Sequence, residues 1–405
     1  MKPIVRAGRM KPVHSDIRGP LFVEAMKRQK QGIDILKLNT GNPATFGFGL
    51  PDSIKNALME HMQDGVGYCD FKGMPQARQA ICDYETSKGI KGITPDDVFI
   101  GNGVSEVVSF ALTPLLNDGD EVLVPSPSYS LWGNSIYLEG GKPVFYTCDE
   151  QANWYPDIQD IRSKITDKTK AIVIINPNNP TGVLYPKELL LEIIQIARES
   201  GLLIFADEIY DRLVMDGKQH ISLASLTEDV PVITLNGLSK SHCLCGYRCG
   251  WMVISGPREL TEDYRQGIIQ LTSLRLCANT LAQIVIPAAL DDMDTPASMV
   301  RPGGRIYEQR EATVRELEKI DGLSFVKNDA AFYVFPKLDV KKFNITNDKQ
   351  FAHDLLDATN ILLVPGSGFD WKDPDHFRIV MLPQADILSD AIRRMGTFLD
   401  GYKQK

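Results

Sequence analysis

Short apolar stretches alternate with amphipathic stretches through the middle of the chain. Seven apolar stretches have the length of β-strands and lie at residues 97–101, 121–125, 143–148, 171–176, 202–207, 232–235 and 250–255. Several, such as AIVIIN and LLIFAD, are almost continuously apolar, which is typical of strands covered on both faces. The intervening stretches, for example residues 186–200, carry apolar residues at helical spacing. The pattern predicts an α/β fold with a mostly parallel sheet and helices on both faces.

The pattern changes after a long helical region around residues 260–290. Residues 323–327 and 331–335 predict a hairpin, which a helix and strands at 361–364 and 377–381 follow. A strand predicted at residues 35–39 has no helix partner of its own, so we expect it to pack against the C-terminal part. The chain is therefore expected to form a large domain at residues 50–295 and a smaller α+β domain from residues 1–49 and 296–405.

Composition excludes several classes of protein. Of the 405 residues, 43% are apolar and 24% charged, which is enough apolar material for a core and argues against disorder. The net charge of −8 offers no basic footprint for nucleic acid or an anionic membrane. The longest apolar run, residues 330–335, is far shorter than the ~20 residues that span a bilayer.

The cysteines and the N-terminus bear on the cellular compartment. Seven cysteines without a CxxC pair or a regular spacing argue against a disulfide framework and favour a reducing compartment. The basic residues among the first fifteen would suit a transit peptide, but Pro3 and Pro12 interrupt an amphipathic helix. We therefore expect a cytoplasmic protein.

Polar segments follow several predicted strands at the sheet edge where such folds bind ligands. They are IGNGVSE at residues 100–106, IINPNNPTG at 174–182, LIFADEIY at 203–210 and LNGLSKSHCLCGYRCGW at 235–251. Taken singly, each has a simpler explanation: an Asp after a strand is commonly a helix cap, and a lone Lys is commonly at the surface. The segment GNGVSE lacks the third glycine of a dinucleotide-binding fingerprint, so a nicotinamide cofactor is weakly supported.

Together these segments favour a different cofactor. They place a helix N-terminus, Asp207, an Asn-rich turn and Lys240 at one edge of the sheet. Pyridoxal 5'-phosphate requires such a set: a lysine for its aldehyde, amides and a cation for its phosphate, and a carboxylate for its ring nitrogen.

The sequence resembles the class I aminotransferases of fold type I along essentially its whole length, and most closely the bacterial glutamate–pyruvate (alanine) aminotransferases. The resemblance depends on GNPATFGF, GYCDFKG, NPNNPTG, ADEIYD, GLSK followed by GYR, and FRIV. Together these motifs are highly specific, whereas NPTG or SK alone would be weak. The resemblance implies pyridoxal 5'-phosphate as cofactor and a homodimer with shared active sites.

By this resemblance Lys240 forms the Schiff base and moves the proton between the substrate α-carbon and the cofactor. A desolvated lysine near cations has its pKa lowered, which suits such a proton transfer. Asp207 matches the partner of the ring nitrogen, and Asn179 and Tyr210 match residues that hydrogen-bond the ring oxygen. Tyr129 matches the aromatic residue stacked on the ring.

Five further residues match the family's phosphate site. The amides of Val104 and Ser105 at a helix start, the hydroxyl of Ser239 and the guanidinium of Arg248 form the expected cup. Tyr68, in GYCDFKG, matches a tyrosine that reaches the phosphate of the neighbouring subunit.

Four residues are expected to contact the substrate. Arg378 in FRIV matches the arginine that clamps the α-carboxylate through a bidentate ion pair, and Asn179 lies within expected reach of the same group. Gly41 matches a backbone position that closes over the substrate, where a side chain would obstruct the approach. Arg18 in SDIRGP is our hypothesis for the partner of the distal carboxylate of glutamate and 2-oxoglutarate, and an ordinary surface arginine is the competing interpretation.

The chain departs from the family pattern at three positions near Lys240. Gly237 stands three positions before the lysine, where a serine is usual, which removes one possible phosphate donor. Cys243 and Cys249 stand where small or aliphatic residues are usual. With His242 and Cys245 they suggest a metal site, but their spacing matches no structural zinc pattern and cations would lie beside it, so we expect no metal.

The resemblance implies transamination between L-alanine and 2-oxoglutarate in a ping-pong cycle, by which one site accepts two substrates in turn. The motifs define the cofactor better than the substrate. An aminotransferase or lyase acting on an aromatic, aspartate or branched-chain donor is therefore the first alternative. A non-catalytic regulator with an aminotransferase-like domain is the second, and the lack of a basic N-terminal domain together with the presence of Lys240 argues against it.

Overall fold

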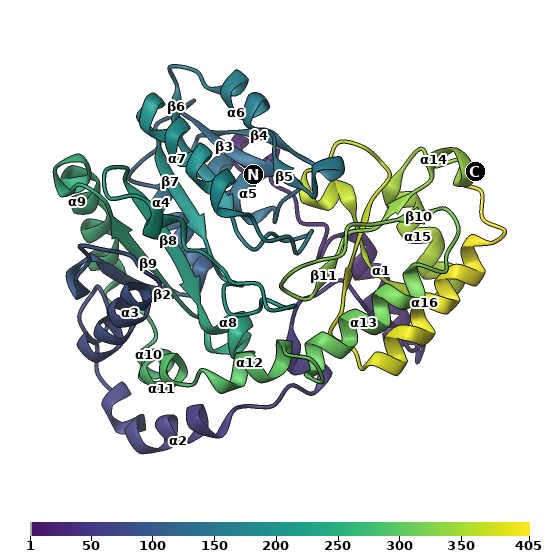
Figure 1. Ribbon diagram of the computed structural model, residues 1–405, viewed down its shortest axis with the longest axis horizontal. Helices are drawn as coiled ribbons and strands as arrows, with labels where there is room; N and C mark the ends of the chain where they lie inside the picture. Colours follow the sequence, from purple (N-terminus) through teal and green to yellow (C-terminus); the bar gives the residue numbers. More distant parts are fainter. Residues whose placement is uncertain (1) are drawn as a thin grey trace.

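An eight-stranded sheet forms the centre of the computed structural model, which describes residues 2–405 (Figure 1). The strand order is β2-β9-β8-β7-β6-β3-β4-β5. The bounds are β2 (Val98–Asn102), β3 (Glu121–Ser126), β4 (Lys142–Asp149), β5 (Tyr155–Pro156), β6 (Thr169–Ile175), β7 (Leu203–Asp207), β8 (Val232–Gly237) and β9 (Cys249–Ser255). Strands β8, β7, β6, β3 and β4 pair in parallel, β9 is antiparallel to β2 and β8, and β5 is antiparallel to β4. The predicted mostly parallel sheet is confirmed.

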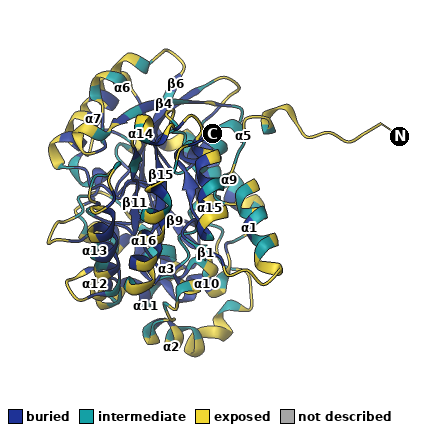
Figure 2. Cartoon of the chain, turned by 90° about the vertical axis from the view of Figure 1, so that its right-hand side faces the viewer, coloured by how far each residue is buried: buried dark blue, intermediate teal, exposed yellow. Residues whose placement is uncertain are grey.

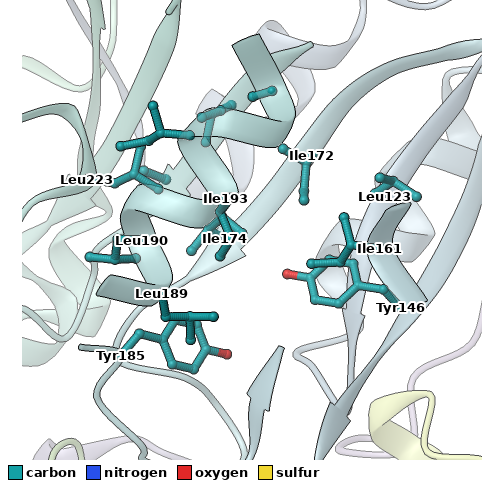
Figure 3. Close-up of a cluster of buried hydrophobic side chains, with 14 of the residues drawn as sticks. Leu123, Tyr146, Ile161, Ile172, Ile174, Tyr185, Leu189, Leu190, Ile193 and Leu223 are labelled. Atoms are coloured by element: carbon teal, nitrogen blue, oxygen red, sulfur yellow. The ribbon is translucent and has the colours of Figure 1, made fainter. Parts of the chain in front are cut away.

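Helices cover both faces of this sheet, as the continuous apolar strands predict. They are α4 (Val104–Leu112), α5 (Leu131–Leu138) and α9 (Arg258–Arg275) on one face, and α6 (Ile158–Lys164) and α7 (Lys187–Ser200) on the other. Within β6, Ala171, Val173 and Ile175 pack with the first group, whereas Ile172 and Ile174 pack with the second (Figure 3). Burying each such isoleucine contributes about 1.5–3 kcal/mol, so a polar substitution between residues 171 and 175 should destabilise the sheet on either face.

A further group of helices packs at the β2 and β9 edge of the sheet. It comprises α2 (Asp52–His61), α3 (Pro75–Ser87), α10 (Thr280–Ile284) and α11 (Ile286–Asp291). A short helix, α8 (Leu238–Ser241), follows β8 directly.

The C-terminal part builds a separate buried cluster beside the sheet, and its helices from residue 305 onward lie on the right of Figure 1. Its helices are α12 (Asp294–Val300), α13 (Arg305–Leu317), α14 (Val340–Phe343), α15 (Asp348–Thr359) and α16 (Ala385–Leu399). Its strands are β10 (Leu323–Ser324), β11 (Tyr333–Val334), β12 (Lys337–Leu338), β13 (Ile361–Leu362), β14 (Val364–Pro365) and β15 (Phe377–Val380). The N-terminal part contributes α1 (Pro20–Lys30) and β1 (Leu36–Lys37), which pairs in parallel with β13.

The predicted hairpin between residues 323–327 and 331–335 is wrong. Strand β10 pairs with β12, whereas β11 pairs with β15 in a three-stranded sheet. The reason is burial: residues 330–335 are all covered, and Val334 packs in the same cluster as Ile379 of β15, while Ser324 of β10 is exposed. The more apolar strand therefore takes the inner position.

Residues 2–7 extend away from the molecule as an exposed arm, which Figure 2 shows in yellow. Among residues 2–405, no single helix is long and apolar enough to cross a membrane. Helix α9 and the α10–α11 stretch reach that length and apolar composition only as a pair, which is bent by 120°.

Candidate active site

A cavity of about 810 Å³ opens where β6, β7 and β8 end. Twelve of the thirteen residues expected at the site line it: Arg18, Gly41, Val104, Ser105, Tyr129, Asn179, Asp207, Tyr210, Ser239, Lys240, Arg248 and Arg378. Tyr68 does not line it, and 84% of its surface is exposed. Residues from both ends of the sequence thus meet in one space with residues that follow β2, β3, β6, β7 and β8.

The carboxylate of Asp207 lies at the end of β7 with only 5% of the residue exposed. The indole Nε1 of Trp132 donates a hydrogen bond to its Oδ2 at 3.1 Å, and the amide of Ile209 donates to Oδ1 at 3.4 Å. Burial raises the pKa of Asp207 to about 6. A cationic group in the cavity would stabilise the ionised form of this carboxylate.

Lys240 belongs to the short helix α8 directly after β8. Its Nζ donates to the carbonyl oxygen of Gly41 at 2.8 Å and lies 4.0 Å from the sulfur of Cys245. The expectation of a lowered pKa is wrong for this arrangement. Burial lowers the pKa of Lys240, but the interactions with Tyr333, Cys245 and Tyr129 outweigh it, and the pKa is raised.

Exposed backbone lines the cavity at the N-terminus of α4. Gly103 precedes α4 with φ +83°, and a β-carbon there would collide with the guanidinium of Arg248. The first amides of α4, including those of Val104 and Ser105, have no acceptor within the helix, and both residues line the cavity. A dianion is the ligand that free amides at a helix N-terminus and an adjacent guanidinium fit.

The structure explains one departure from the family pattern. A β-carbon on Gly237 would lie 2.5 Å from the carbonyl oxygen of Cys249, because β8 and β9 pair at this position. A serine therefore has no room at position 237 in this backbone.

The guanidinium of Arg378 is buried, with 1% of the residue exposed, and lies between aromatic rings. It donates to Oδ1 of Asn179 at 2.9 Å and to the carbonyl oxygen of Asn39, and the rings of Tyr333 and Phe369 lie 4.6 Å away. Burial lowers its pKa, its Nε has no partner, and no carboxylate within residues 2–405 pairs with it. A buried guanidinium in this state fits a ligand carboxylate.

Sequence reasoning missed two residues that complete the site. Trp132 lies on α5 within an apolar stretch that predicts only a core position. Tyr333 lies in the apolar run of β11, and its hydroxyl is 2.8 Å from that of Tyr210. Nothing in either local pattern marks these side chains as different from ordinary core residues.

The comparison with protein families decides the identity of the fold. The family model for aminotransferases of class I and II matches residues 33–392. The chain belongs to this family. Its α/β architecture with a large, mostly parallel sheet is that of the pyridoxal-phosphate fold type I.

Individual aminotransferases match over the full length. The glutamate-pyruvate aminotransferase AlaA of Haemophilus influenzae is 50% identical over 404 residues, which cover 100% of both chains. AlaA of Escherichia coli K12 is 47% identical with the same coverage. A crystal structure of an aminotransferase from Escherichia coli superimposes with a TM-score of 0.98 at 47% identity, covering 100% of both chains.

Aminotransferases of this family depend on pyridoxal phosphate, and the cavity fits that group. Within residues 2–405, the buried carboxylate of Asp207 has no cationic partner and the Nε of Arg378 has no hydrogen-bond partner, and the bare backbone at Gly103 lets the guanidinium of Arg248 lie beside the N-terminus of α4. Each of these features corresponds to one charged group of the cofactor or its substrate.

Proposed function

We propose that this aminotransferase moves the amino group between L-alanine and 2-oxoglutarate with pyridoxal 5'-phosphate as its cofactor. The observation that carries the proposal is the convergence of Lys240, Asp207 and Arg378 on one cavity. The names of the full-length relatives, glutamate-pyruvate aminotransferase and alanine aminotransferase, support the substrate pair.

The cofactor, when bound, supplies a carbonyl that takes up the amino group and a ring that withdraws electrons from the substrate α-carbon. Asp207 would hold the proton on the ring nitrogen, because its buried carboxylate has no other cationic partner within residues 2–405. Lys240 would bind the carbonyl and then carry the proton at the α-carbon. Its hydrogen bond to Gly41 keeps the amine within the cavity.

The other lining residues would orient the reactants. Val104, Ser105, Ser239 and Arg248 would hold the phosphate, with Arg248 meeting two of its oxygens. Tyr129 would stack on the ring, and Tyr210 and Asn179 would hydrogen-bond its hydroxyl.

Substrate orientation would depend on two arginines. Arg378, held by Asn179, would clamp the α-carboxylate that every substrate shares. Arg18, on the N-terminal side of the cavity, would meet the distal carboxylate of glutamate and 2-oxoglutarate but not the methyl group of alanine.

We also propose a homodimer with shared sites. Tyr68 is exposed, and exposed apolar side chains lie on the neighbouring elements: Met59, Met62, Val66, Leu274, Leu276 and Leu281. Residues 62–65 contact α10 directly, since the hydroxyl of Thr280 donates to the carbonyl oxygen of Gly65. A second copy that covered this face would bring Tyr68 to the phosphate of the partner's site.

Two organisational features belong to the same proposal. The separate buried cluster that joins Leu38 to residues 317–399 supports a small domain formed by residues 1–49 and 296–405, beside a large domain at 50–295. The seven cysteines are all free thiols, which supports a reducing, cytoplasmic location.

The visible absorbance of the purified protein tests the proposed function. We expect a yellow protein whose band bleaches on addition of L-alanine, with release of pyruvate, and returns on addition of 2-oxoglutarate. Lys240→Ala should abolish both the band and the turnover, and Asp207→Ala should retain some cofactor but lose most of the rate. An active Lys240→Ala protein would disprove the assignment, and bleaching by aromatic or aspartate donors in place of alanine would favour the alternative substrates.

A further inference from the structure

A buried ion cluster lies next to the cavity but outside it. The ammonium of Lys88, at the end of α3, is 2.8 Å from Glu85, 2.7 Å from Glu208 and 3.1 Å from Asp211. The three carboxylate side chains are at most 4% exposed. Among the residues described, 2–405, Lys88 is the only lysine or arginine in ion-pair contact with them. Removing it would leave three carboxylates without a cation in a nearly dry site.

The cluster connects the two segments that carry the proposed catalytic groups. Glu208 and Asp211 belong to the turn after β7, which also holds Asp207 and Tyr210. Asp211 accepts a hydrogen bond from the side chain of Asn236 at 2.7 Å, and Asn236 lies at the end of β8, four residues before Lys240.

Further contacts fix the same two segments. The amide of Glu208 donates to the carbonyl oxygen of Leu235 at 2.9 Å, and Oδ1 of Asn236 accepts from the amide of Gly237 at 2.7 Å. Glu85 accepts from the indole of Trp251 in β9 at 3.1 Å, so α3 and the sheet are joined at this point. Lys88 therefore sits where three elements behind the cavity meet.

The other charged and titratable groups around Lys88 do not replace it. They are Tyr84 and Glu85 of α3, Glu208, Asp211 and Arg212 of the turn, and His220. Burial lowers the pKa of His220, and its Nε2 lies 3.1 Å from the carbonyl oxygen of Asn176. The guanidinium of Arg212 donates to the carbonyl oxygens of Ala289 and Leu290 instead.

One interpretation of this site as a metal centre can be set aside. Glu208, Asp211 and His220 are the one set of potential metal ligands within residues 2–405 whose donor atoms lie within 4.8 Å of one another. The ammonium of Lys88 lies against two of the three and takes the position of the cation.

We propose that Lys88 is a positioning residue for transamination: its ammonium holds the turn 207–211 against the end of β8, so that Asp207 and Lys240 keep their relative placement. This inference rests on the proposed function for its catalytic consequence. Lys88 also balances the charge of Glu208, which lies next to Asp207 in the sequence. Burial is the main cause that raises the pKa of Asp207, and the charge of Glu208 raises it further.

The test is Lys88→Met in the holoenzyme, with Lys91→Met as matched control. Lys91 lies three residues further on and pairs at 2.7 Å with Glu228 at the exposed surface, so the same substitution there removes only a solvated ion pair. Lys88→Met should lower kcat about ten- to a hundredfold, because small displacements of reacting groups have effects of that order. The circular dichroism of the bound cofactor should change, and the acidic limb of kcat should move to higher pH. Lys91→Met should match the wild type in all three.

The double variant Lys88→Met/Glu208→Gln removes one charge of each sign. It should return the acidic limb toward that of the wild type, which a purely structural role of Lys88 would not produce. If Lys88→Met does not fold, the double variant carries the test, with a lowered kcat and altered dichroism as the expected result. Wild-type kcat and dichroism in whichever of the two variants carries the test would overturn the inference.

Amide hydrogen exchange separates this inference from the proposed function. In the cofactor-free protein, Lys88→Met should speed exchange in residues 207–211 and 236–240 but not in α7. Unchanged exchange in the first two segments would overturn the positioning role. A wild-type protein that exchanges as expected but does not transaminate would contradict the proposed function alone.

Discussion

The indole Nε1 of Trp132 donates a buried hydrogen bond to Oδ2 of Asp207 at 3.1 Å. The bond favours the ionised carboxylate, which burial alone would disfavour. Trp132→Phe keeps the ring but removes this donor, so we expect a rise in the pKa of Asp207, weaker cofactor binding and a roughly tenfold lower kcat, on the scale of 1.5–3 kcal/mol for a hydrogen bond to a charged group. Cofactor titration and kcat measure the effect.

Trp154 offers the matched control, since it is equally buried but packs against Phe335 and Trp371 in another cluster. Trp154→Phe should lower the melting temperature without changing cofactor affinity. Equal losses of cofactor affinity in both variants would show that the hydrogen bond of Trp132 is not the cause.

Asp207 should destabilise the cofactor-free protein above pH 6. Its pKa is raised from 3.8 to about 6 by burial, so the folded state binds the proton more tightly than the unfolded state. Stability from this group is therefore lost as the pH rises from 4 to 6, by up to about 3 kcal/mol at 1.36 kcal/mol per unit. Asp207→Asn should melt higher than the wild type at pH 7.5 and at a similar temperature at pH 4, both without cofactor. A lower melting temperature at pH 7.5 would contradict this.

His14 should fasten the N-terminal segment that carries Arg18 to the cavity wall. Its ring pairs with Asp370 at 3.1 Å and Asp16 at 3.5 Å, and its backbone exchanges two hydrogen bonds with the side chain of Asn134. The bonds to these aspartates raise the pKa of His14 to about 9. Its contribution is thus complete below pH 6.5 and is lost as the pH rises through 9.

The consequence is a pH-dependent KM for 2-oxoglutarate. In the wild type the KM should rise above pH 9, and His14→Gln should show the raised KM already at pH 7.5. His353→Gln removes an exposed histidine that pairs with Asp357 on α15 and should leave the KM unchanged. A flat KM between pH 7 and 10 in the wild type would refute the role of His14.

The two arginines of the cavity should differ in the substrates they affect. Arg378→Lys removes a guanidinium that two neighbours hold in place, so kcat/KM should fall on the order of 100-fold for alanine and for 2-oxoglutarate alike. Arg18→Ala should raise the KM for glutamate and 2-oxoglutarate and leave that for alanine and pyruvate unchanged. Arg9→Ala, at an exposed residue of the short 3-10 helix Gly8–Met10, serves as control. An unchanged KM for 2-oxoglutarate in Arg18→Ala would refute the assignment of Arg18.

Subunit mixing tests the shared site. Lys240→Ala and Tyr68→Ala proteins should each have low activity, but a mixed dimer contains one site in which both residues are intact. Refolding the two variants together should therefore restore activity, up to roughly a quarter of the wild-type level if half of the dimers are mixed. No recovery, with dimers formed, would place Tyr68 in its own subunit's site or in none.

The sequence predicted the large sheet well because its strands carry their own signal. AIVIIN and LLIFAD are apolar on both faces, which only helices on both sides of a sheet can satisfy. The pairing of β10 and β11 could not be read in the same way, since short strands of two residues obtain their partners from tertiary burial.

The site shows the same division. Lys240, Asp207 and Arg378 stand in motifs that mark the site when they are taken together. Trp132 and Tyr333 are apolar side chains with one polar atom, and each lies in a stretch where an aromatic core residue is expected. Only the fold shows where those polar atoms point. The predicted direction of the Lys240 pKa shift was wrong for a related reason, because Tyr333 and Tyr129, which help to raise this pKa, come from distant segments.

The hydrogen bond from Arg378 to the carbonyl oxygen of Asn39 joins residues 339 positions apart in the chain. During synthesis, the first of these leaves the ribosome long before the second exists. The sheet has all its strands once residue 255 has emerged, but the carboxylate clamp formed by Arg378 with Asn179 and Asn39 comes together only when nearly the whole polypeptide is released. Catalytic activity therefore requires the C-terminal part of the chain. A prematurely terminated or C-terminally clipped chain can build the sheet and still have no working site.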